Sequence, residues 1–168
     1  MPTFAQSIDI DASPSELFWL MQDYGVRLEW DPFLIEARMV DGAEPGRGAR
    51  AWCVDRRRRG METEYVSFKP PERVAVRMTK GPWMFRSFAG AWIYAPTDLG
   101  TRVTFKYHVE ARPRIGRLSD WVLERIFARE MRKRLVALKT AVERTDLLDR
   151  FAGGPGPTGT RAPNESNS

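Results

Sequence analysis

The sequence predicts an α+β fold in which a seven-stranded, antiparallel, curved sheet wraps around one long helix near the C-terminal end. Two features of the chain lead to this prediction. Most of residues 3–111 divides into short segments in which apolar and polar residues alternate, as in strands with one buried face. Residues 115–150 form the only segment that is periodic enough for a long helix. Because such a sheet must bury its apolar face, we expect the long helix to cover it.

The N-terminal part of the chain is expected to form one strand and then two short helices. Residues 3–11 alternate in hydrophobicity, which is typical of a strand. Ser13 can cap the helix that follows, because Pro14 suits its first position and Glu16 can complete a capping box. The second short helix, over 26–30, should end before the Asp-Pro pair, since the residue before a proline disfavours the helical conformation.

Six further strands are expected where turn-forming residues break the chain. They cover residues 34–40, 49–55, 61–68, 73–79, 83–95 and 101–111. Residues 96–100 join the last two of these strands as a hairpin turn. The last strand alternates cleanly between apolar and polar side chains, so one face of the sheet should be buried and the other hydrated.

The predicted long helix carries one apolar stripe. Ser119 or Asp120 can cap its first turn, and no glycine or proline follows this cap before Gly153. The residues of the stripe are three or four positions apart: Leu123, Phe127, Met131, Leu135, Leu138 and Val142. Beyond this helix almost no apolar residue occurs. We therefore assign residues 1–150 to one folded domain and residues 151–168 to a disordered tail.

The composition is typical of one soluble domain. The chain has 168 residues, of which 42% are hydrophobic, and its 6 Trp and 9 Phe suffice for a large core. The net charge of +5 permits contact with an anionic surface without requiring it. Cys53 is the single cysteine, which excludes an internal disulfide. We see neither a signal peptide nor an apolar run that could span a membrane, and we expect a cytoplasmic protein.

Histidine and cysteine offer little chemistry in this sequence. His108 is the only histidine and shares the hydrated face of its strand with Lys106, so neither a metal site nor a Ser-His-Asp triad is expected. Cys53 has no second cysteine or nearby histidine to activate it, and we interpret it as unreactive. No cofactor is expected.

Five short motifs, taken in order, resemble one superfamily. They are Ile8-Asp9-Ile10-Asp11-Ala12-Ser13-Pro14, Trp30-Asp31-Pro32, Pro70-Pro71-Glu72-Arg73-Val74, Gly90-Ala91-Trp92-Ile93-Tyr94 and Gly100-Thr101-Arg102-Val103. With the closing helix they cover about residues 3–145 and resemble the START-like, or Bet v 1-like, helix-grip superfamily, in its bacterial polyketide cyclase/dehydrase-type (SRPBCC) branch. Members of the superfamily include aromatase/cyclases, lipid and sterol carriers, quinone-binding proteins and plant hormone receptors. The resemblance implies a largely apolar cavity between sheet and C-terminal helix that holds a hydrophobic or aromatic molecule.

Candidate ligand contacts come from both the sheet and the long helix. Trp92 and Tyr94 share a strand face with Arg86, Phe88 and Gly90, and Gly90 would leave room for a ligand or for the helix. If this face looks inward, its aromatic side chains either line a cavity or fill the core. The candidate ligand-binding residues are Trp30, Trp52, Phe88, Trp92, Tyr94, Tyr107, Phe127, Met131, Arg134, Leu135 and Leu138.

Arg134 is the most informative of these candidates, because it lies within the apolar stripe of the helix. A charged group there must be paired or must face a hydrated cavity. It would donate hydrogen bonds to a ligand carbonyl or carboxylate, or form an ion pair with Glu130 or Glu64. Arg86 has similar alternatives. If the protein is an enzyme, the catalytic candidates are Arg86, Arg134, Tyr94 and Tyr107.

Four consecutive arginines, Arg56–Arg59, precede Gly60 and predict an exposed hairpin tip. Such a tip could contact membrane headgroups or an acidic carrier protein. Trp83 and Phe85, near a turn-forming Lys-Gly-Pro segment, favour transient membrane contact. Nucleic acid is not an expected partner, because interleaved aromatic residues and a reading element are both missing.

Three functions follow from these observations. The first is binding of a hydrophobic or aromatic small molecule, such as a polyketide, a quinone or a lipid. The second is a polyketide aromatase/cyclase or dehydratase, in which Arg86 or Arg134 polarises a carbonyl and Tyr94 or Tyr107 moves a proton. Aromatase/cyclase members carry a cavity arginine where this chain offers Lys69, which favours binding over catalysis. The third is a lipid or quinone carrier that docks on membranes through its basic hairpin. The sequence fits a monomer or a homodimer.

Overall fold

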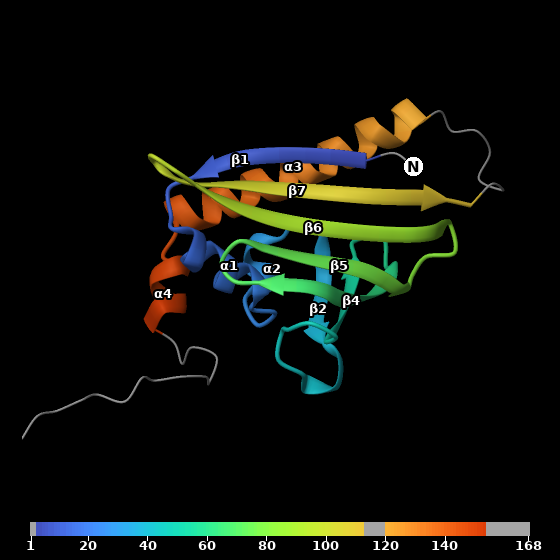
Figure 1. Cartoon of the computed structure of the whole chain (residues 1–168), viewed down its shortest axis with the longest axis horizontal. Coiled ribbons are helices and arrows are strands. Elements are labelled where there is room, and N and C mark those ends of the chain that lie inside the picture. Colours follow the sequence, from blue (N-terminus) through green and yellow to red (C-terminus); the bar gives the residue numbers. More distant parts are fainter. Residues whose placement is uncertain (1–2, 113–119, 154–168) are drawn as a thin grey trace, which may run out of the picture.

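The structure, a computed structural model, describes residues 3–112 and 120–153 and has the expected α+β architecture (Figure 1). In chain order the elements are β1 (Thr3–Ile10), α1 (Pro14–Gln22), α2 (Arg27–Trp30), β2 (Leu34–Met39), η1 (Val40–Gly42), β3 (Arg50–Asp55), β4 (Gly60–Lys69), β5 (Arg73–Lys80), β6 (Phe85–Thr97), β7 (Gly100–Ala111), α3 (Asp120–Arg144) and α4 (Leu147–Gly153). The strands form one antiparallel sheet in the order β1-β7-β6-β5-β4-β3-β2. The curved sheet and the long helix confirm the predicted fold class.

The first helix begins at the predicted cap. The Ser13 side chain accepts a hydrogen bond from the backbone N–H of Glu16 at 3.3 Å, and the Glu16 carboxylate accepts one from the backbone N–H of Ser13 at 2.9 Å. This capping box satisfies two donors at the start of α1, and the bonds to Ser13 lower the pKa of Glu16. Helix α1 then buries Leu17, Phe18 and Leu20 completely in the core.

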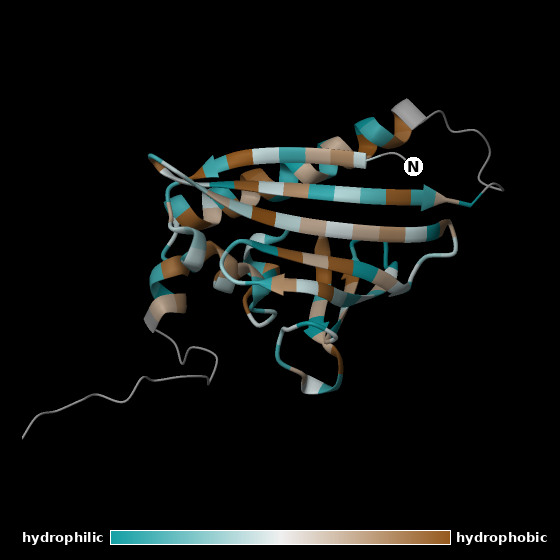
Figure 2. Ribbon diagram, viewed as in Figure 1, coloured by the Kyte–Doolittle hydropathy of each residue, from teal (hydrophilic) through white to brown (hydrophobic). Residues whose placement is uncertain are grey.

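Strand β7 fixes the position of both of its neighbours. It pairs along its length with β1 and β6, and only Asp98 and Leu99 connect it to β6. Gly100 follows with φ of 138°, and a Cβ atom there would lie 2.2 Å from the carbonyl oxygen of Ile10. Glycine is therefore required where the hairpin passes β1. Figure 2 shows hydrophobic and hydrophilic residues alternating along β7, as the sequence predicts.

The C-terminal helix is interrupted, contrary to the prediction of one helix over 115–150. Helix α3 ends at Arg144 and α4 starts at Leu147. Between them, the Thr145 hydroxyl donates to the carbonyl oxygen of Ala141 and accepts from the backbone N–H of Leu147 at 3.2 Å. A threonine hydroxyl that bonds locally to the backbone competes with helical hydrogen bonds, so the helix ends here without glycine or proline.

The apolar stripe of α3 is buried as predicted along most of its length. Its buried members are Met131, Leu135, Leu138 and Val142, whereas Leu123 and Phe127 are partly buried. The predicted cap at Ser119 lies outside the described residues, and the side chain of Asp120 is not described. Of the predicted tail over 151–168, residues 151–153 belong to α4 and the rest lies outside the described residues.

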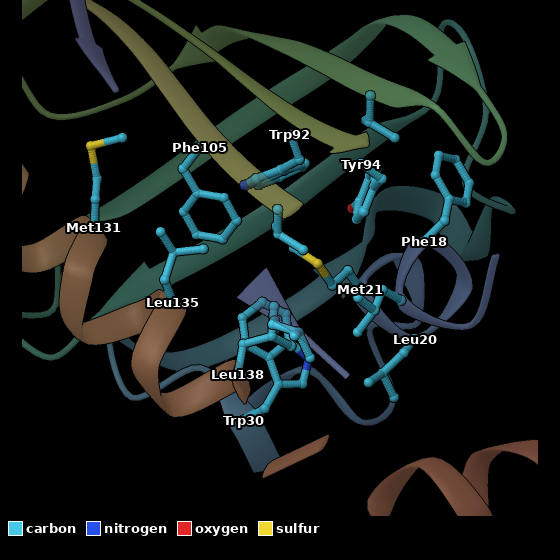
Figure 3. Close-up of a cluster of buried hydrophobic side chains, with 14 of the residues drawn as sticks. Phe18, Leu20, Met21, Trp30, Trp92, Tyr94, Phe105, Met131, Leu135 and Leu138 are labelled. Carbon is cyan, nitrogen blue, oxygen red and sulfur yellow. The ribbon is translucent and has the colours of Figure 1, made fainter. Parts of the chain in front are cut away.

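The core lies between the concave face of the sheet and the helices. Figure 3 shows side chains from α1, α3, β6 and β7 gathered in one cluster with Trp30, which comes from α2. Trp30, Phe105 and Met131 are at most 2% exposed. In the described part of the chain, no helix has the length and apolar character needed to cross a membrane.

Candidate functional site

Two arginines and one aspartate form an ion cluster inside the core. Arg134 in α3 donates through Nε and Nη2 to the two oxygens of Asp31, at 3.0 and 2.7 Å. Arg27 in α2 donates through Nε to Asp31 Oδ2 at 3.1 Å. Arg27, Asp31 and Arg134 are only 2%, 1% and 8% exposed. One carboxylate thus serves two guanidinium groups, and the cluster carries a net charge of +1.

Local structure holds this cluster in place. Asp31 ends α2 in an extended conformation, and the backbone N–H of Phe33 donates to Asp31 Oδ1 at 3.2 Å. Arg27 Nη1 donates to the carbonyl oxygen of Met21 at 2.8 Å, and Arg134 Nη1 donates to the Tyr107 hydroxyl at 2.6 Å. Burial alone would raise the pKa of Asp31, but the two guanidinium groups outweigh burial and lower it. The carboxylate is therefore ionised at neutral pH.

Aromatic rings surround the two guanidinium groups. The Arg27 guanidinium carbon lies 4.5 Å from the ring centroid of Trp30 and 5.1 Å from that of Trp92. That of Arg134 lies 5.2 Å from Phe33 and 5.5 Å from Phe105. The negative faces of these rings stabilise the buried positive charge in part.

A chain of hydrogen-bonded side chains lies beside the cluster. The Tyr65 hydroxyl donates to Gln22 Oε1 at 2.9 Å, and Gln22 Nε2 donates to the Tyr94 hydroxyl at 3.3 Å. The hydroxyls of Tyr24 and Tyr65 are 3.1 Å apart. Burial raises the pKa of Tyr24 to about 12 and raises those of Tyr65 and Tyr94 as well. All three phenols are therefore neutral at pH 7.

A pocket of about 320 Å³ opens next to this chain. It is lined by residues of α1, β2 and α4 and of the segments that follow α1 and η1: Trp19, Gln22, Asp23, Tyr24, Gly25, Met39, Ala43, Glu44, Pro45 and Phe151. Gln22 and Tyr24 belong to both the pocket and the hydrogen-bonded chain. We call this the α1–α4 pocket. A larger hollow of about 520 Å³ includes the ion-paired Glu64 and Arg77, and this polar lining suits an apolar guest less well.

Most of the predicted ligand contacts come together in the interior, where they fill it with protein side chains. Those that are less than 9% exposed are Trp30, Trp92, Tyr94, Tyr107, Met131, Arg134, Leu135 and Leu138. Figure 3 shows six of these around Phe105. Phe88 and Phe127 are partly buried, and Phe127 stacks on Phe4 with centroids 5.2 Å apart. The room expected over Gly90 is taken by Tyr107, whose ring would lie 3.3 Å from a Cβ atom there.

Trp52 and Arg86 lie away from the cluster. Trp52 follows the fully buried Ala51 in β3, so its side chain projects from the other face of the sheet, over Gly60. The prediction that Arg86 shares the face of Trp92 is wrong, because an irregular register at the start of β6 breaks the alternation. The Arg86 side chain is 70% exposed and pairs with Glu110 at 3.2 Å.

The sequence-based reasoning missed the partners of Arg134. Glu130 and Glu64, the partners that the sequence suggests, pair with Lys133 and Arg77 instead. Arg27 and Asp31 are not among the predicted site residues, although their spacing of four positions is a signal that the sequence offers. The expected exposure of His108 agrees with the structure. His108 is exposed and lies 2.9 Å from the Thr3 hydroxyl, and burial raises the pKa of Cys53, as fits an unreactive thiol.

A curved antiparallel sheet that closes on a long C-terminal helix defines the START-like, or Bet v 1-like, helix-grip class. The family model described as polyketide cyclase / dehydrase and lipid transport matches residues 1–143, and the chain belongs to this family. No curated protein matches the chain in sequence.

Several solved structures share the fold. TTHA0849 from Thermus thermophilus is 20% identical, with a TM-score of 0.72 over 84% of this chain and 97% of that chain. Ara h 8.0201 is 13% identical, with a TM-score of 0.65 over 84% and 97%. The di-domain ARO/CYC StfQ from the steffimycin biosynthetic pathway is 13% identical, with a TM-score of 0.69 over 90% of this chain and 52% of that chain. At these identities the likeness shows the fold alone.

Proposed function

We propose that the protein binds a hydrophobic or aromatic small molecule, of polyketide, quinone or lipid type, in the α1–α4 pocket. The observation that carries this proposal is a pocket whose lining combines apolar side chains with hydrogen-bonding ones. Trp19, Met39 and Phe151 supply apolar surface, while Gln22 and Tyr24 supply hydrogen-bonding groups. A volume of about 320 Å³ is within the usual range of small-molecule sites. Membership of a family described by polyketide chemistry and lipid transport supports the same class of ligand.

In this proposal the ligand occupies one end of the space between the sheet and the C-terminal helices. The centre of that space is filled by Trp30, Trp92 and Leu138. Burial of apolar ligand surface provides most of the affinity, at roughly 25 cal/mol per Å². Gln22 and Tyr24 orient any oxygen on the ligand, since both are already fixed by neighbouring hydrogen bonds.

We favour binding over the aromatase/cyclase alternative because the candidate catalytic groups are occupied. Arg134 commits three of its five N–H donors to Asp31 and Tyr107 and is 8% exposed, so it is poorly placed to polarise a substrate carbonyl. Burial raises the pKa of both Tyr94 and Tyr107, which makes them poor bases at neutral pH. Arg86 is exposed on the surface.

Binding should be measurable with N-phenyl-1-naphthylamine, a neutral aromatic probe whose fluorescence rises in apolar surroundings. We expect saturable binding that Ala43→Trp weakens about tenfold or more, because the new side chain fills the pocket. Ala43 is exposed, so this variant should fold normally. Ala5→Trp, on an exposed position of β1, is the matched control. Native mass spectrometry of protein purified from its own host should show a bound apolar molecule. If Ala43→Trp and Ala5→Trp bound the probe equally well, the binding site would lie outside the α1–α4 pocket.

A carrier that docks on membranes is the second candidate, because a basic and aromatic surface lies at one end of the sheet. Arg57 and Arg58 are exposed at the tip of the β3–β4 hairpin, whereas Arg59 is held by Asp55 at 2.6 Å. Arg59 Nη1 also contacts the Met84 sulfur at 3.6 Å, which places the hairpin next to the β5–β6 loop. Trp83 in that loop is 68% exposed. A basic cluster with an exposed tryptophan is suited to anionic lipid surfaces.

Sedimentation with phosphatidylcholine vesicles that contain phosphatidylserine tests whether the protein docks on membranes as a carrier would. We expect Arg57→Ser/Arg58→Ser to weaken binding about tenfold or more, since each basic residue near such a surface contributes ~1 kcal/mol. Arg38→Ser/Arg47→Ser removes two exposed arginines from β2 and the loop after it, and should leave binding unchanged. Binding should also fall with added salt. If both double variants lost vesicle binding equally, binding would depend on net charge alone, and a specific docking surface at the β3–β4 hairpin would be refuted.

A further inference from the structure

We propose that the ligand carries a cationic nitrogen, an ammonium group in the simplest case, which binds the carboxylates and aromatic rings of the α1–α4 pocket. This inference rests on the proposed function and names the chemical class of the ligand. Both charged residues of the lining, Asp23 and Glu44, are acidic, and none of the described lining residues is basic. The whole chain has 27 basic and 22 acidic residues, so an acidic lining runs against its composition.

The two carboxylates keep hydrogen-bonding capacity for a ligand. Asp23 Oδ1 accepts a hydrogen bond from the backbone N–H of Gly25 at 2.7 Å, and Oδ2 has no partner among the described residues. Glu44 is exposed and forms no ion pair within the described part of the chain. A carboxylate only accepts hydrogen bonds, so these two groups match a ligand that donates them and carries positive charge.

The aromatic rings of the lining are the second and independent argument. Trp19, Tyr24 and Phe151 bring three aromatic side chains to one pocket. The faces of such rings attract cations, and sites rich in them recognise quaternary ammonium groups. Tyr24 already interacts in this way within the protein, since the Arg27 guanidinium carbon lies 5.8 Å from its ring centroid. A ring system with a cationic nitrogen would therefore use both the rings and the carboxylates.

Helix α1 adds negative potential on the same side. Trp19 and Gln22 belong to its last turn, Asp23 is its C-cap, and this turn carries no basic residue. The carbonyl oxygens at the C-terminus of a helix carry partial negative charge, which favours a cation nearby. The pocket thus combines a helix C-terminus with two carboxylates.

The basic side chains next to the lining are already engaged by acidic partners. Arg27 contacts Tyr24, while Arg38 and Arg150 adjoin lining residues in sequence. The pairs are Arg27 with Asp31, Arg38 with Glu36, and Arg150 with Glu29 and Asp146. The single excess positive charge of the ion cluster is smaller than the two negative charges of the lining. The pocket should therefore attract a cation and repel a carboxylate.

The proposal predicts a preference for amines over the matching alcohols. Calorimetric titration at pH 7 with 1-naphthylmethylamine, which is protonated, and with 1-naphthalenemethanol isolates the charge, because the two compounds have the same ring system and nearly the same size. We expect the amine to bind about tenfold more tightly. Asp23→Asn/Glu44→Gln should bring the two affinities together. This variant should fold, since asparagine keeps the oxygen that accepts from Gly25 and Glu44 is exposed.

The matched control is Asp98→Asn/Glu124→Gln, which removes two exposed carboxylates outside the pocket and should keep the preference for the amine. Glu44→Lys provides a further test, because a positive charge in the lining should make the alcohol the tighter ligand. Circular dichroism checks that each variant is folded.

The outcomes separate this inference from the proposed function. Equal affinities for amine and alcohol in the wild type would overturn the inference and leave the proposed function intact. A preference for the amine that persists in folded Asp23→Asn/Glu44→Gln would also overturn it. The same holds if the control variant loses the preference to the same extent, because the effect would then come from net charge alone. If neither compound nor N-phenyl-1-naphthylamine binds the wild type, the proposed function itself fails.

Discussion

Replacing Asp31 by asparagine should lower the free energy of unfolding by about 3–5 kcal/mol, as is typical when one partner of a buried ion pair is removed. The substitution preserves the shape of the side chain but leaves Arg27 and Arg134 without a counter-ion. The two arginine side chains are only 2% and 10% exposed, so water cannot replace the carboxylate without opening the core. Urea denaturation, monitored by tryptophan fluorescence and by circular dichroism, measures this change.

The matched control is Asp9→Asn. Asp9 pairs with Arg102 at 2.8 Å, but both side chains are more than half exposed. Exposed ion pairs contribute little to stability, so this variant should differ from the wild type far less than Asp31→Asn does. If Asp9→Asn and Asp31→Asn lowered the free energy of unfolding by comparable amounts, the result would contradict a charged cluster that is shielded from water in the core.

The difference in stability between the wild type and Asp31→Asn should also depend on pH. The pKa of Asp31 is lowered in the folded state, where the two guanidinium groups outweigh the effect of burial. A group of this kind contributes its full stabilisation above its unfolded pKa of about 4 and loses it as the pH falls through the folded value. The difference in unfolding free energy between the two proteins should therefore be constant near neutral pH and should become smaller below about pH 4. If the difference in unfolding free energy instead grew in acid, the pKa of Asp31 would be raised in the folded state, and the stabilising role of the ionised carboxylate would be refuted.

Local signals explain why most of the fold was predictable from the sequence. The capping box at Ser13 and Glu16 requires only residues close in the chain, and its hydrogen bonds form as predicted. Strict alternation likewise fixes the buried face of β7. The predictions from sequence fail where a single residue ends a helix or a single register shift changes the face to which a side chain points. The hydroxyl of Thr145 ends α3, and an irregularity at the start of β6 turns Arg86 outward.

The candidate site was predictable only in part, because its charges meet through tertiary packing. Arg134 was singled out by its place in an apolar stripe, which is a property of one helix. Its partner Asp31 is 103 residues away in sequence, and no local pattern links the two. Arg27 and Asp31 form an i,i+4 pair whose spacing, in isolation, is typical of a surface ion pair. They become buried only because α2 packs beneath the sheet and against α3.

Trp30→Ala should produce the other large effect, a loss of about 3–5 kcal/mol in the free energy of unfolding. Trp30 is 2% exposed and belongs to the buried cluster drawn in Figure 3. Its removal also takes away an aromatic ring whose centroid lies 4.5 Å from the Arg27 guanidinium carbon. Trp83→Ala deletes the same side chain where it is 68% exposed, and should change stability very little.

The same variant tests whether the filled interior limits the size of the ligand. Deleting Trp30 should open an apolar cavity between the sheet and α3, and such cavities bind apolar guests when they stay empty of water. We therefore expect Trp30→Ala, at a temperature where it remains folded, to bind N-phenyl-1-naphthylamine with higher stoichiometry or affinity than the wild type. Trp83→Ala should bind it as the wild type does. If Trp30→Ala loses stability but gains no binding, the interior has collapsed, and Trp30 is then a packing residue rather than the limit on ligand size.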